Sequence, residues 1–296
     1  MSHYSIWVME YAYVSQCAVS SVIYGAHNQG TRKLPYCYVV IKSGDHIAMV
    51  DVGYNDKEYG RYIGEKFGVE NWHSPADVLA PCGIRPEDVN SIFLTHAHFD
   101  HMGNTDAFPN ATFYIQEREL TKWIWAMSLP DRLRYMMVAT DPSDVLRCAD
   151  LARQGRLRLV DGDMANVIPG IDLYAAPDTH TYGCQWLHVR NDLQAQSQDS
   201  WALAGDLVYV YENIEGMNGD KKYLPVGLAM GSITNLVMAT EVIMKSVGYE
   251  TQRVIPVHEE GLKDVFPSRI TASGLRISEI CLASGQKSLV NSALTR

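Results

Sequence analysis

Three histidines and one aspartate fall within the six consecutive residues from His96 to His101. The whole chain contains ten histidines among its 296 residues, so this density argues against a chance cluster in a solvated turn. Neutral imidazoles and carboxylates are good ligands for zinc and similar first-row metals. The pattern therefore predicts a metal-binding cluster made of His96, His98, Asp100 and His101.

The cluster directly follows a short apolar stretch, residues 91–94, which is typical of a buried strand. It is therefore expected on the turn that leaves the end of this strand. A turn can direct alternate side chains into one cavity, whereas a helix would scatter them around its axis. We accordingly interpret residues 95–103 as a loop that presents ligands.

The spacing His-x-His-x-Asp-His resembles the signature of the metallo-β-lactamase superfamily. In that family the first two histidines bind one metal and the Asp-His pair binds a second. A two-metal site needs further ligands, and three downstream residues each leave an apolar, strand-like stretch: His180, Asp206 and His258. Each alone would be typical of a surface turn, but together and in this order they indicate one site.

The order of these residues along the chain matches the order of the ligands in the superfamily. The resemblance implies two zinc ions per chain, with other divalent metals left open, and one bridging carboxylate. The implied ligands are His96, His98 and His180 for metal one, Asp100, His101 and His258 for metal two, and Asp206 as the bridge. The resemblance also implies an α/β fold, the αβ/βα four-layer sandwich of two mixed β-sheets with outer helices, and a site at one sheet edge.

Within the superfamily the chain is similar to the N-acyl homoserine lactone lactonases, from about residue 34 to residue 260. In those lactonases a tyrosine three residues after the bridging aspartate contacts the substrate carbonyl, and Tyr209 occupies this position. One stretch departs from the family, because Cys184 replaces the second histidine of Thr-Pro-Gly-His-Thr-Pro-Gly-His. The similarity is carried by residues 34–38, 50–53, 95–103, 161–163, 169–171 and 206–209.

The resemblance implies a quorum-quenching hydrolase that opens an N-acyl homoserine lactone-like cyclic ester by attack of a metal-bound hydroxide. Bound divalent metals lower the pKa of water toward ~7, so the nucleophile forms at neutral pH. Tyr209 would donate a hydrogen bond to the developing oxyanion, an effect typically worth a few kcal/mol. Asp100 would carry the proton of the nucleophile to the leaving group.

Several other activities share parts of this signature. The alternatives are hydrolysis of another cyclic ester or amide, an iron-dependent persulfide dioxygenase with one iron, a β-lactamase or thioester hydrolase, and a catalytically silent binding protein. The presence of both Asp100 and Tyr209 favours hydrolysis over the oxidoreductase. The full ligand set argues against a silent protein.

Asp51 stands before Val-Gly at the end of a predicted strand. It either shapes this turn or orients a ligand histidine without binding the metal itself, and the sequence leaves both interpretations open.

Strands and helices alternate along the chain, which is typical of an α/β protein. Residues 1–35 show no strong period. Predicted strands cover residues 36–42, 46–51, 91–95, 111–115, 157–160, 171–174, 185–189, 200–204 and 253–257. Predicted helices cover residues 74–83, 117–127, 144–153 and 232–248, the first and last with Ser74 and Ser232 as N-caps.

The composition favours a small-molecule substrate over nucleic acid or a membrane, because the net charge is −9 and no basic block is present. No signal peptide or spanning segment is expected, and the six dispersed cysteines are interpreted as reduced thiols in the cytoplasm. We expect a single domain over residues 1–296, with 285–296 as a frayed tail; a homodimer is left open.

Overall fold

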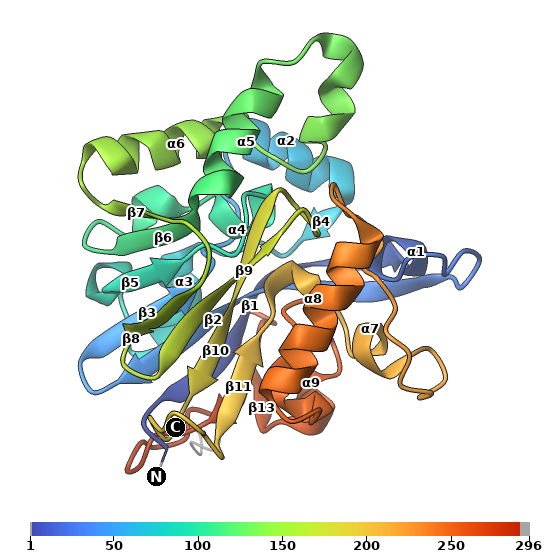
Figure 1. Ribbon diagram of the computed structural model, residues 1–296. Helices are drawn as coiled ribbons and strands as arrows, with labels where there is room; N and C mark the ends of the chain where they lie inside the picture. The colour runs from blue at the N-terminus through green and yellow to red at the C-terminus, as the bar shows by residue number, and fades with distance from the viewer. Residues whose placement is uncertain (1, 291–296) are drawn as a thin grey trace.

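The computed structural model of the chain describes residues 2–290. Two β-sheets face each other and helices lie on their outer sides (Figure 1). Each sheet contains both parallel and antiparallel strand pairs. The predicted fold class, a sandwich of two mixed sheets with outer helices, is therefore confirmed.

The larger sheet has nine strands within the described residues, in the order β13-β14-β1-β2-β3-β5-β6-β7, with β4 paired to β1. β3, β5, β6 and β7 run parallel, so their carboxyl ends lie along the same edge. The strands are β1 (Ser5–Ala18), β2 (Thr31–Ser43), β3 (His46–Val50), β4 (Val69–Glu70), β5 (Ser91–Phe93), β6 (Thr112–Gln116), β7 (Leu157–Val160), β13 (Ser268–Ile270) and β14 (Arg276–Cys281).

The smaller sheet has the order β12-β11-β10-β9-β8. β10 and β11 form an antiparallel hairpin, and β12 joins β11 in parallel. The strands are β8 (Met164–Ile168), β9 (Ile171–Pro177), β10 (Gly183–Arg190), β11 (Ser200–Leu203) and β12 (Val254–Ile255).

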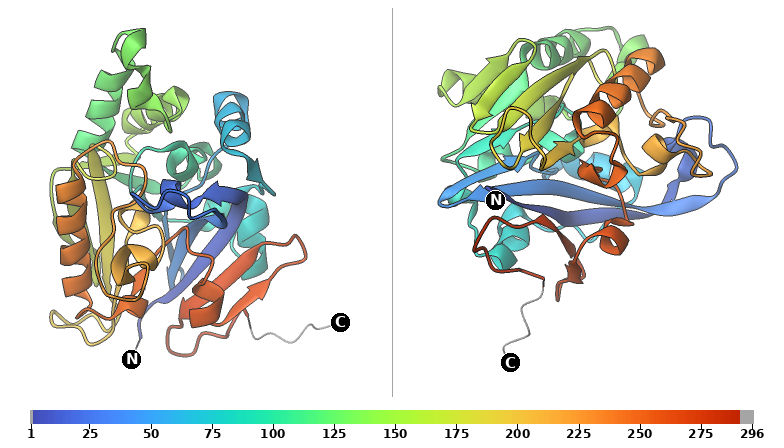
Figure 2. Two further views of the ribbon diagram at one scale, coloured as in Figure 1. Left: turned by 90° about the vertical axis from the view of Figure 1, so that its right-hand side faces the viewer. Right: turned by 60° about the horizontal axis from the view of Figure 1, so that its bottom comes forward.

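Helices cover both outer faces. α8 lies against the smaller sheet and α3 lies against β1 of the larger one (Figures 1 and 2). α5 contacts both β6 and β10, where the two sheets approach each other, and α6 packs against α5 and β7. The α-helices are α1 (Val19–Val22), α2 (Glu58–Phe67), α3 (Pro75–Leu79), α4 (Phe99–Met102), α5 (Glu117–Met127), α6 (Pro142–Arg153), α7 (Glu212–Glu215), α8 (Ile233–Ser246) and α9 (Leu262–Val265). Short 3-10 turns lie at Ala80–Cys82, Pro86–Asp88, Thr105–Ala107, Asp131–Met137, Gly205–Leu207 and Thr251–Arg253.

The core between the sheets is formed by alternate residues of facing strands. Phe93 of the larger sheet is buried in one cluster with Leu173, Leu187 and Leu203 of the smaller sheet. The other face of the larger sheet packs against helices in a second apolar cluster. Such burial on two faces rigidly fixes the strand ends that carry the functional residues.

The N-terminal strand β1 shows why residues 1–35 lack a clear period. Ile6 and Val8 point into the cluster between the sheets, while Trp7 and Met9 point into the other cluster. All four side chains are almost completely buried. A strand that is buried on both faces reads as continuous apolar sequence, so alternation cannot reveal it.

All four predicted helices are present, although the first is α-helical only over Pro75–Leu79, and α2 was not predicted. α5 has the predicted bounds, and the Ser74 side chain accepts a hydrogen bond from the Asp77 backbone N–H at the start of α3. The strands β8, β13 and β14 were not predicted. β8 pairs with the next strand β9, and β13 pairs with the next strand β14. β8 and β13 have no fully buried residue, so their sequences lack the apolar alternation that marks a half-buried strand.

The extent of the domain and its tail stay predictions. Residues 291–296 of the expected frayed segment lie outside the described residues, whereas Leu289 and Val290 pack against the core. Within the described part of the chain, no helix combines the length and the apolar character that crossing a membrane requires.

Candidate metal centre

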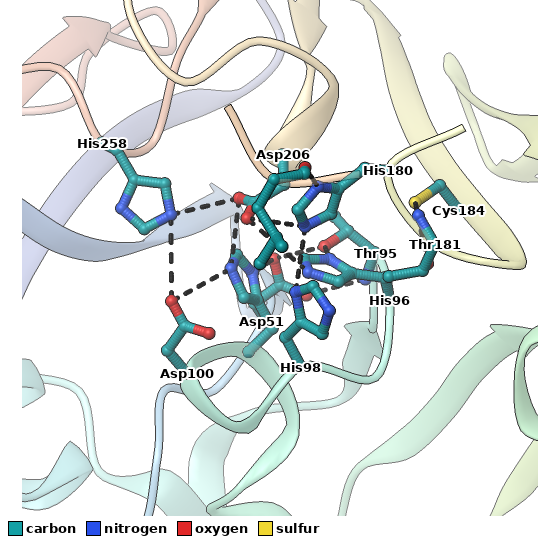
Figure 3. A network of polar contacts seen from close by, with 12 residues as sticks. Asp51, Thr95, His96, His98, Asp100, His180, Thr181, Cys184, Asp206 and His258 are labelled. Carbon is teal, nitrogen blue, oxygen red and sulfur yellow. Dashed lines mark hydrogen bonds and ion pairs between the residues drawn. The ribbon is translucent and has the colours of Figure 1, made fainter. Parts of the chain in front are cut away.

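The seven predicted ligands converge at one edge of the sandwich (Figure 3). Four come from the segment that follows β5, and one comes from each of the loops that follow β9, β11 and β12. Their ligand atoms form two groups, and within each group all these atoms lie within 4.8 Å of one another. The groups are His96, His98, His180 and Asp206, and Asp100, His101 and His258.

Only part of the first cluster lies on a loop, so the expectation for residues 95–103 was wrong at its second half. His98 is the N-cap of α4, and Asp100 and His101 lie within that helix. A long helix would scatter these side chains around its axis, but α4 is only a single turn. Neighbouring residues on a helix differ by about 100°, so Asp100 and His101 can approach one centre from two directions.

The first group surrounds one oxygen of Asp206. The Asp206 Oδ2 atom lies 3.3 Å from His180 Nε2 and 3.7 Å from His96 Nε2. His98 turns its Nδ1 toward the same point, 2.9 Å from His180 Nε2. Three imidazoles and a carboxylate oxygen therefore face a common centre.

The second group surrounds the other oxygen of Asp206. His101 Nε2 and His258 Nε2 each lie 3.2 Å from Asp206 Oδ1. Asp100 Oδ2 lies 3.5 Å from His101 Nε2 and 3.9 Å from His258 Nε2. Asp206 therefore presents one oxygen to each group, which is the geometry a bridging carboxylate requires.

The orientation of the histidines is set from outside the two groups. Four of them are hydrogen-bonded through Nδ1, which leaves Nε2 directed at the centre, as is common for histidine ligands. The partners are Thr95 Oγ1 for His96 (3.0 Å), Asp51 Oδ2 for His101 (2.8 Å), the Leu228 carbonyl for His180 (2.6 Å) and the Pro35 carbonyl for His258 (2.7 Å).

Asp51 satisfies both interpretations that the sequence left open. Its Oδ1 accepts the Thr95 backbone N–H at 2.7 Å, and its Oδ2 accepts the Thr95 hydroxyl and lies against His101 Nδ1, both at 2.8 Å. Its φ of 64° is in the left-handed region, which aspartate tolerates better than most residues. Asp51 therefore shapes the turn and orients a predicted ligand.

Three buried polar atoms that face the centre have no hydrogen-bond partner in the described protein: Nε2 of His96 and His101, and Oδ1 of Asp206. Buried polar atoms without partners are costly, so such a concentration needs an explanation. Divalent metals bind nitrogen and carboxylate oxygen in such donor sets. The residues present therefore fit a metal-binding site.

The electrostatics of the site agree with this interpretation. Burial lowers the pKa of His96 and His98 well below the usual range, so both imidazoles are neutral, the form that binds metal. Burial would raise the pKa of Asp206, but His101 and His258 outweigh it and hold this pKa well below its usual value. Burial opposes the protonation of His101, yet the charges of Asp206 and Asp100 raise its pKa well above the usual value. The buried carboxylates are therefore stabilised by nearby positive charge.

Tyr209 lies beside both groups. Its ring packs 4.9 Å from the His258 ring and 5.6 Å from the His180 ring, measured between centroids. Burial, together with the nearby negative charges of Asp206 and Asp100, raises its pKa well above the usual range, so the phenol keeps its proton. Tyr209 therefore lies beside a candidate ligand of each group, and its role toward a substrate stays a prediction.

A cavity of about 470 Å³ opens onto this centre. Asp100, Asp206, Tyr209 and His258 line its inner end. Much of the remaining wall is apolar and includes Val14, Leu34, Phe67, Val138 and Leu228. The cavity can therefore hold a molecule with a reactive polar end and an apolar remainder.

Three residues near the site were not assigned a role from the sequence or departed from the family pattern. Tyr36 lines the cavity, and Glu119 of α5 is buried against the ligand loops. No sequence signal singled out Glu119, because the helix around it reads as core. Cys184 lies outside both groups, and its Sγ accepts the Thr181 backbone N–H at 3.2 Å.

The metallo-beta-lactamase superfamily matches the sequence over residues 30–239, more than half of the chain. An N-acyl homoserine lactonase from Bacillus thuringiensis is 27% identical over 139 residues, covering 47% of this chain and 46% of the relative. The chain thus spans about half the length of this relative. An N-acyl homoserine lactonase from Bacillus cereus is 28% identical over 65% of this chain and 66% of its own. A probable metallo-hydrolase from Mycobacterium tuberculosis is 45% identical over 33% of this chain and 34% of its own.

Solved structures share the fold. An N-acyl homoserine lactone hydrolase with N-hexanoyl-L-homoserine at its catalytic metal centre has a TM-score of 0.62 at 19% identity, covering 90% of this chain and 97% of its own. AidC, described as a dizinc quorum-quenching lactonase, has a TM-score of 0.62 at 15% identity, covering 96% of both chains. At these identities the likeness concerns the fold alone.

Replacing Asp206 tests whether one carboxylate serves both groups. We expect Asp206→Ala to weaken divalent metal binding by more than about tenfold, because substitutions of outer partners alone often cost that much. Zinc retained after gel filtration is the measurement, and Asp161→Ala, at an exposed position, is the control. Wild-type zinc content in Asp206→Ala would place the bridge elsewhere.

Proposed function

We propose that this chain, which belongs to the metallo-beta-lactamase superfamily, is a metal-dependent hydrolase that opens cyclic esters of the N-acyl homoserine lactone class with two zinc ions. The observation that carries the proposal is the position of Asp206, whose two oxygens face two separate histidine-aspartate groups. The similarity to named lactonases supports the choice of substrate class.

The proposed zinc ligands are the two groups already described, with Asp206 between them. When bound, two divalent metals supply a water molecule activated at neutral pH and polarise the carbonyl of the substrate. The protein positions these groups through the hydrogen bonds that fix each histidine. Their burial excludes bulk water from the reacting end of the cavity.

Two side chains of the protein act on the substrate in this proposal. Tyr209 lines the cavity together with Asp100, Asp206 and His258, and its hydroxyl would donate a hydrogen bond to the carbonyl oxygen as negative charge develops there. Asp100 lines the same cavity and can accept a proton from the attacking water.

The reaction balances without a covalent enzyme intermediate. The oxygen of water bonds to the carbonyl carbon, and the bond between this carbon and the ring oxygen breaks. Asp100 passes the proton to the ring oxygen, which becomes a hydroxyl group. The product is a ring-opened hydroxy acid, and the apolar cavity wall would contact the acyl chain of such a substrate.

The substrate is a small molecule in this proposal, and the reaction requires no partner chain. A cytoplasmic location and a homodimer stay predictions from the sequence.

Metal content separates the proposed hydrolase from the iron oxidoreductase. We expect two zinc ions per chain in carefully loaded protein, because two ligand groups are present. Elemental analysis measures this number. A maximum of one metal per chain would contradict the dinuclear proposal, and bound iron with oxygen uptake on a persulfide would support the oxidoreductase instead.

A substrate panel tests the reaction. We expect zinc-loaded protein to open N-acyl homoserine lactones, with acid release followed by a pH indicator and the hydroxy acid identified by mass spectrometry. Asp206→Ala serves as the inactive control for spontaneous opening. Hydrolysis of β-lactams or thioesters without any lactone opening would overturn the substrate assignment.

Tyr209→Phe removes one hydroxyl group and keeps the ring that packs on His258 and His180. We expect unchanged zinc content and a loss of roughly tenfold or more in kcat and in kcat/KM, because the lost hydrogen bond strengthens as charge builds on the oxygen. Activity should not vanish, since the metals still polarise the carbonyl.

The matched control is Tyr211→Phe, because the Tyr211 hydroxyl is buried outside the cavity and has no hydrogen-bond partner in the described protein. Equal kcat values for Tyr209→Phe and the wild type would make Tyr209 a wall residue only.

A further inference from the structure

Glu119 is a completely buried carboxylate that lies outside both candidate ligand groups. It lies in the first turn of α5, between the segment that follows β5 and the loop that joins β9 to β10. A buried carboxylate is costly unless it is paired or hydrogen-bonded. Its partners therefore indicate what it does.

Each of the two carboxylate oxygens of Glu119 accepts two hydrogen bonds. Oε1 accepts the Ala97 backbone N–H at 2.8 Å and the Trp123 indole N–H at 2.7 Å. Oε2 accepts the Thr181 hydroxyl at 2.9 Å and the Gly183 backbone N–H at 2.5 Å. All four bonds are charge-assisted if the carboxylate is ionised, which makes them stronger than neutral ones.

These donors stand next to the histidines of the first group. Ala97 lies between His96 and His98, and Thr181 directly follows His180. The Trp123 ring also lies beside the His98 ring, with 5.9 Å between centroids. One carboxylate thus connects both loops that carry the three histidines.

The second group has a different support. His101 is oriented by Asp51, and His258 by the Pro35 carbonyl. None of the hydrogen bonds found for Glu119 reaches Asp100, His101 or His258. Glu119 therefore supports only the loops of the first group, whereas Asp51 contacts His101 of the second group directly and also holds Thr95 beside His96.

The backbone at Gly183 packs directly against the backbone of Glu119, which leaves no room for a side chain at position 183. A Cβ atom at Gly183 would lie 2.4 Å from the Glu119 backbone nitrogen, closer than real side chains approach. The absence of a side chain lets the loop after His180 lie directly on the first turn of α5. The contact with Glu119 is consequently part of the packing of this loop.

We infer that Glu119 is a positioning residue for the first metal group and sets the zinc affinity of that group selectively. It does not bind the metal. It holds the backbone on either side of the three histidines, so that their ring nitrogens remain directed at one point. The inference rests on the proposed metal site, but it concerns affinity rather than the substrate.

The informative substitution is Glu119→Gln. An amide keeps one acceptor oxygen at nearly the same volume, but its NH2 group cannot accept the other two hydrogen bonds. Glu119→Ala would leave four buried donors without partners and could prevent folding. Glu117→Gln removes an exposed carboxylate of the same helix and is the matched control.

Two background variants separate the two groups. His258→Ala removes a ligand of the second group and leaves the first intact, whereas His180→Ala does the reverse. Zinc affinity is measured by competition with a chromophoric chelator, and near-ultraviolet circular dichroism reports folding. Trp123→Phe, which removes one donor to Glu119, is the milder second variant.

We expect Glu119→Gln to weaken zinc binding about 10- to 100-fold in the His258→Ala background. Zinc affinity in the His180→Ala background should stay within about twofold, and Glu117→Gln should change neither. Trp123→Phe should weaken the first group in the same direction by a smaller factor. The cobalt-substituted protein should show an altered absorption spectrum only when the first group is present.

Equal weakening in both backgrounds, or unchanged affinity in both, overturns the inference. If Glu119→Gln does not fold, the same selectivity is required of Trp123→Phe, and its absence overturns the inference. Failure of the proposed function can be distinguished from failure of the inference about Glu119. Wild-type protein with one zinc per chain contradicts the dinuclear proposal, while the response of that zinc to Glu119→Gln still decides the role of Glu119.

Discussion

The arrangement of this site depends on one buried carboxylate placed between two sets of imidazoles. Asp206 is 3% exposed, and its two oxygens face the two groups separately. Removing a carboxylate from water is costly, and here the cost is offset only by positive charge supplied nearby. His101 and His258 supply part of it, which explains why their pKa values are raised against the effect of burial. A bound metal would relieve the same imbalance more completely.

Two buried carboxylates outside the ligand groups support the site from different sides. Asp51 fixes His101 and the turn before His96, while Glu119 connects the two loops of the first group. Backbone carbonyls orient His180 and His258. Ligands held by such partners lose little freedom on binding metal, because their rings are oriented in advance. Buried polar groups around the centre therefore orient the candidate ligands.

The sandwich supplies the geometry that these contacts refine. The parallel strands β3, β5 and β6 end at one edge, and the loops after β9, β11 and β12 meet them from the smaller sheet. Residues as distant along the chain as Asp100 and His258 thereby become neighbours, with 3.9 Å between Asp100 Oδ2 and His258 Nε2. The apolar cluster between the sheets contains Phe93, Leu173 and Leu187 and fixes the position of the two sets of loops relative to each other.

The sequence by itself predicted the candidate ligand residues, the α/β class and four of the helices, α3, α5, α6 and α8, but not α2. These features depend on local chemistry: dense histidines, a serine before proline, and apolar residues at helical spacing. The tertiary structure alone decided the rest. β1 is buried on both faces and has no readable alternation, α4 is too short to be predicted, and Glu119 looks like any helical glutamate. Its role arises from Ala97, Thr181 and Gly183, which only the packing of the two loops on α5 brings to it.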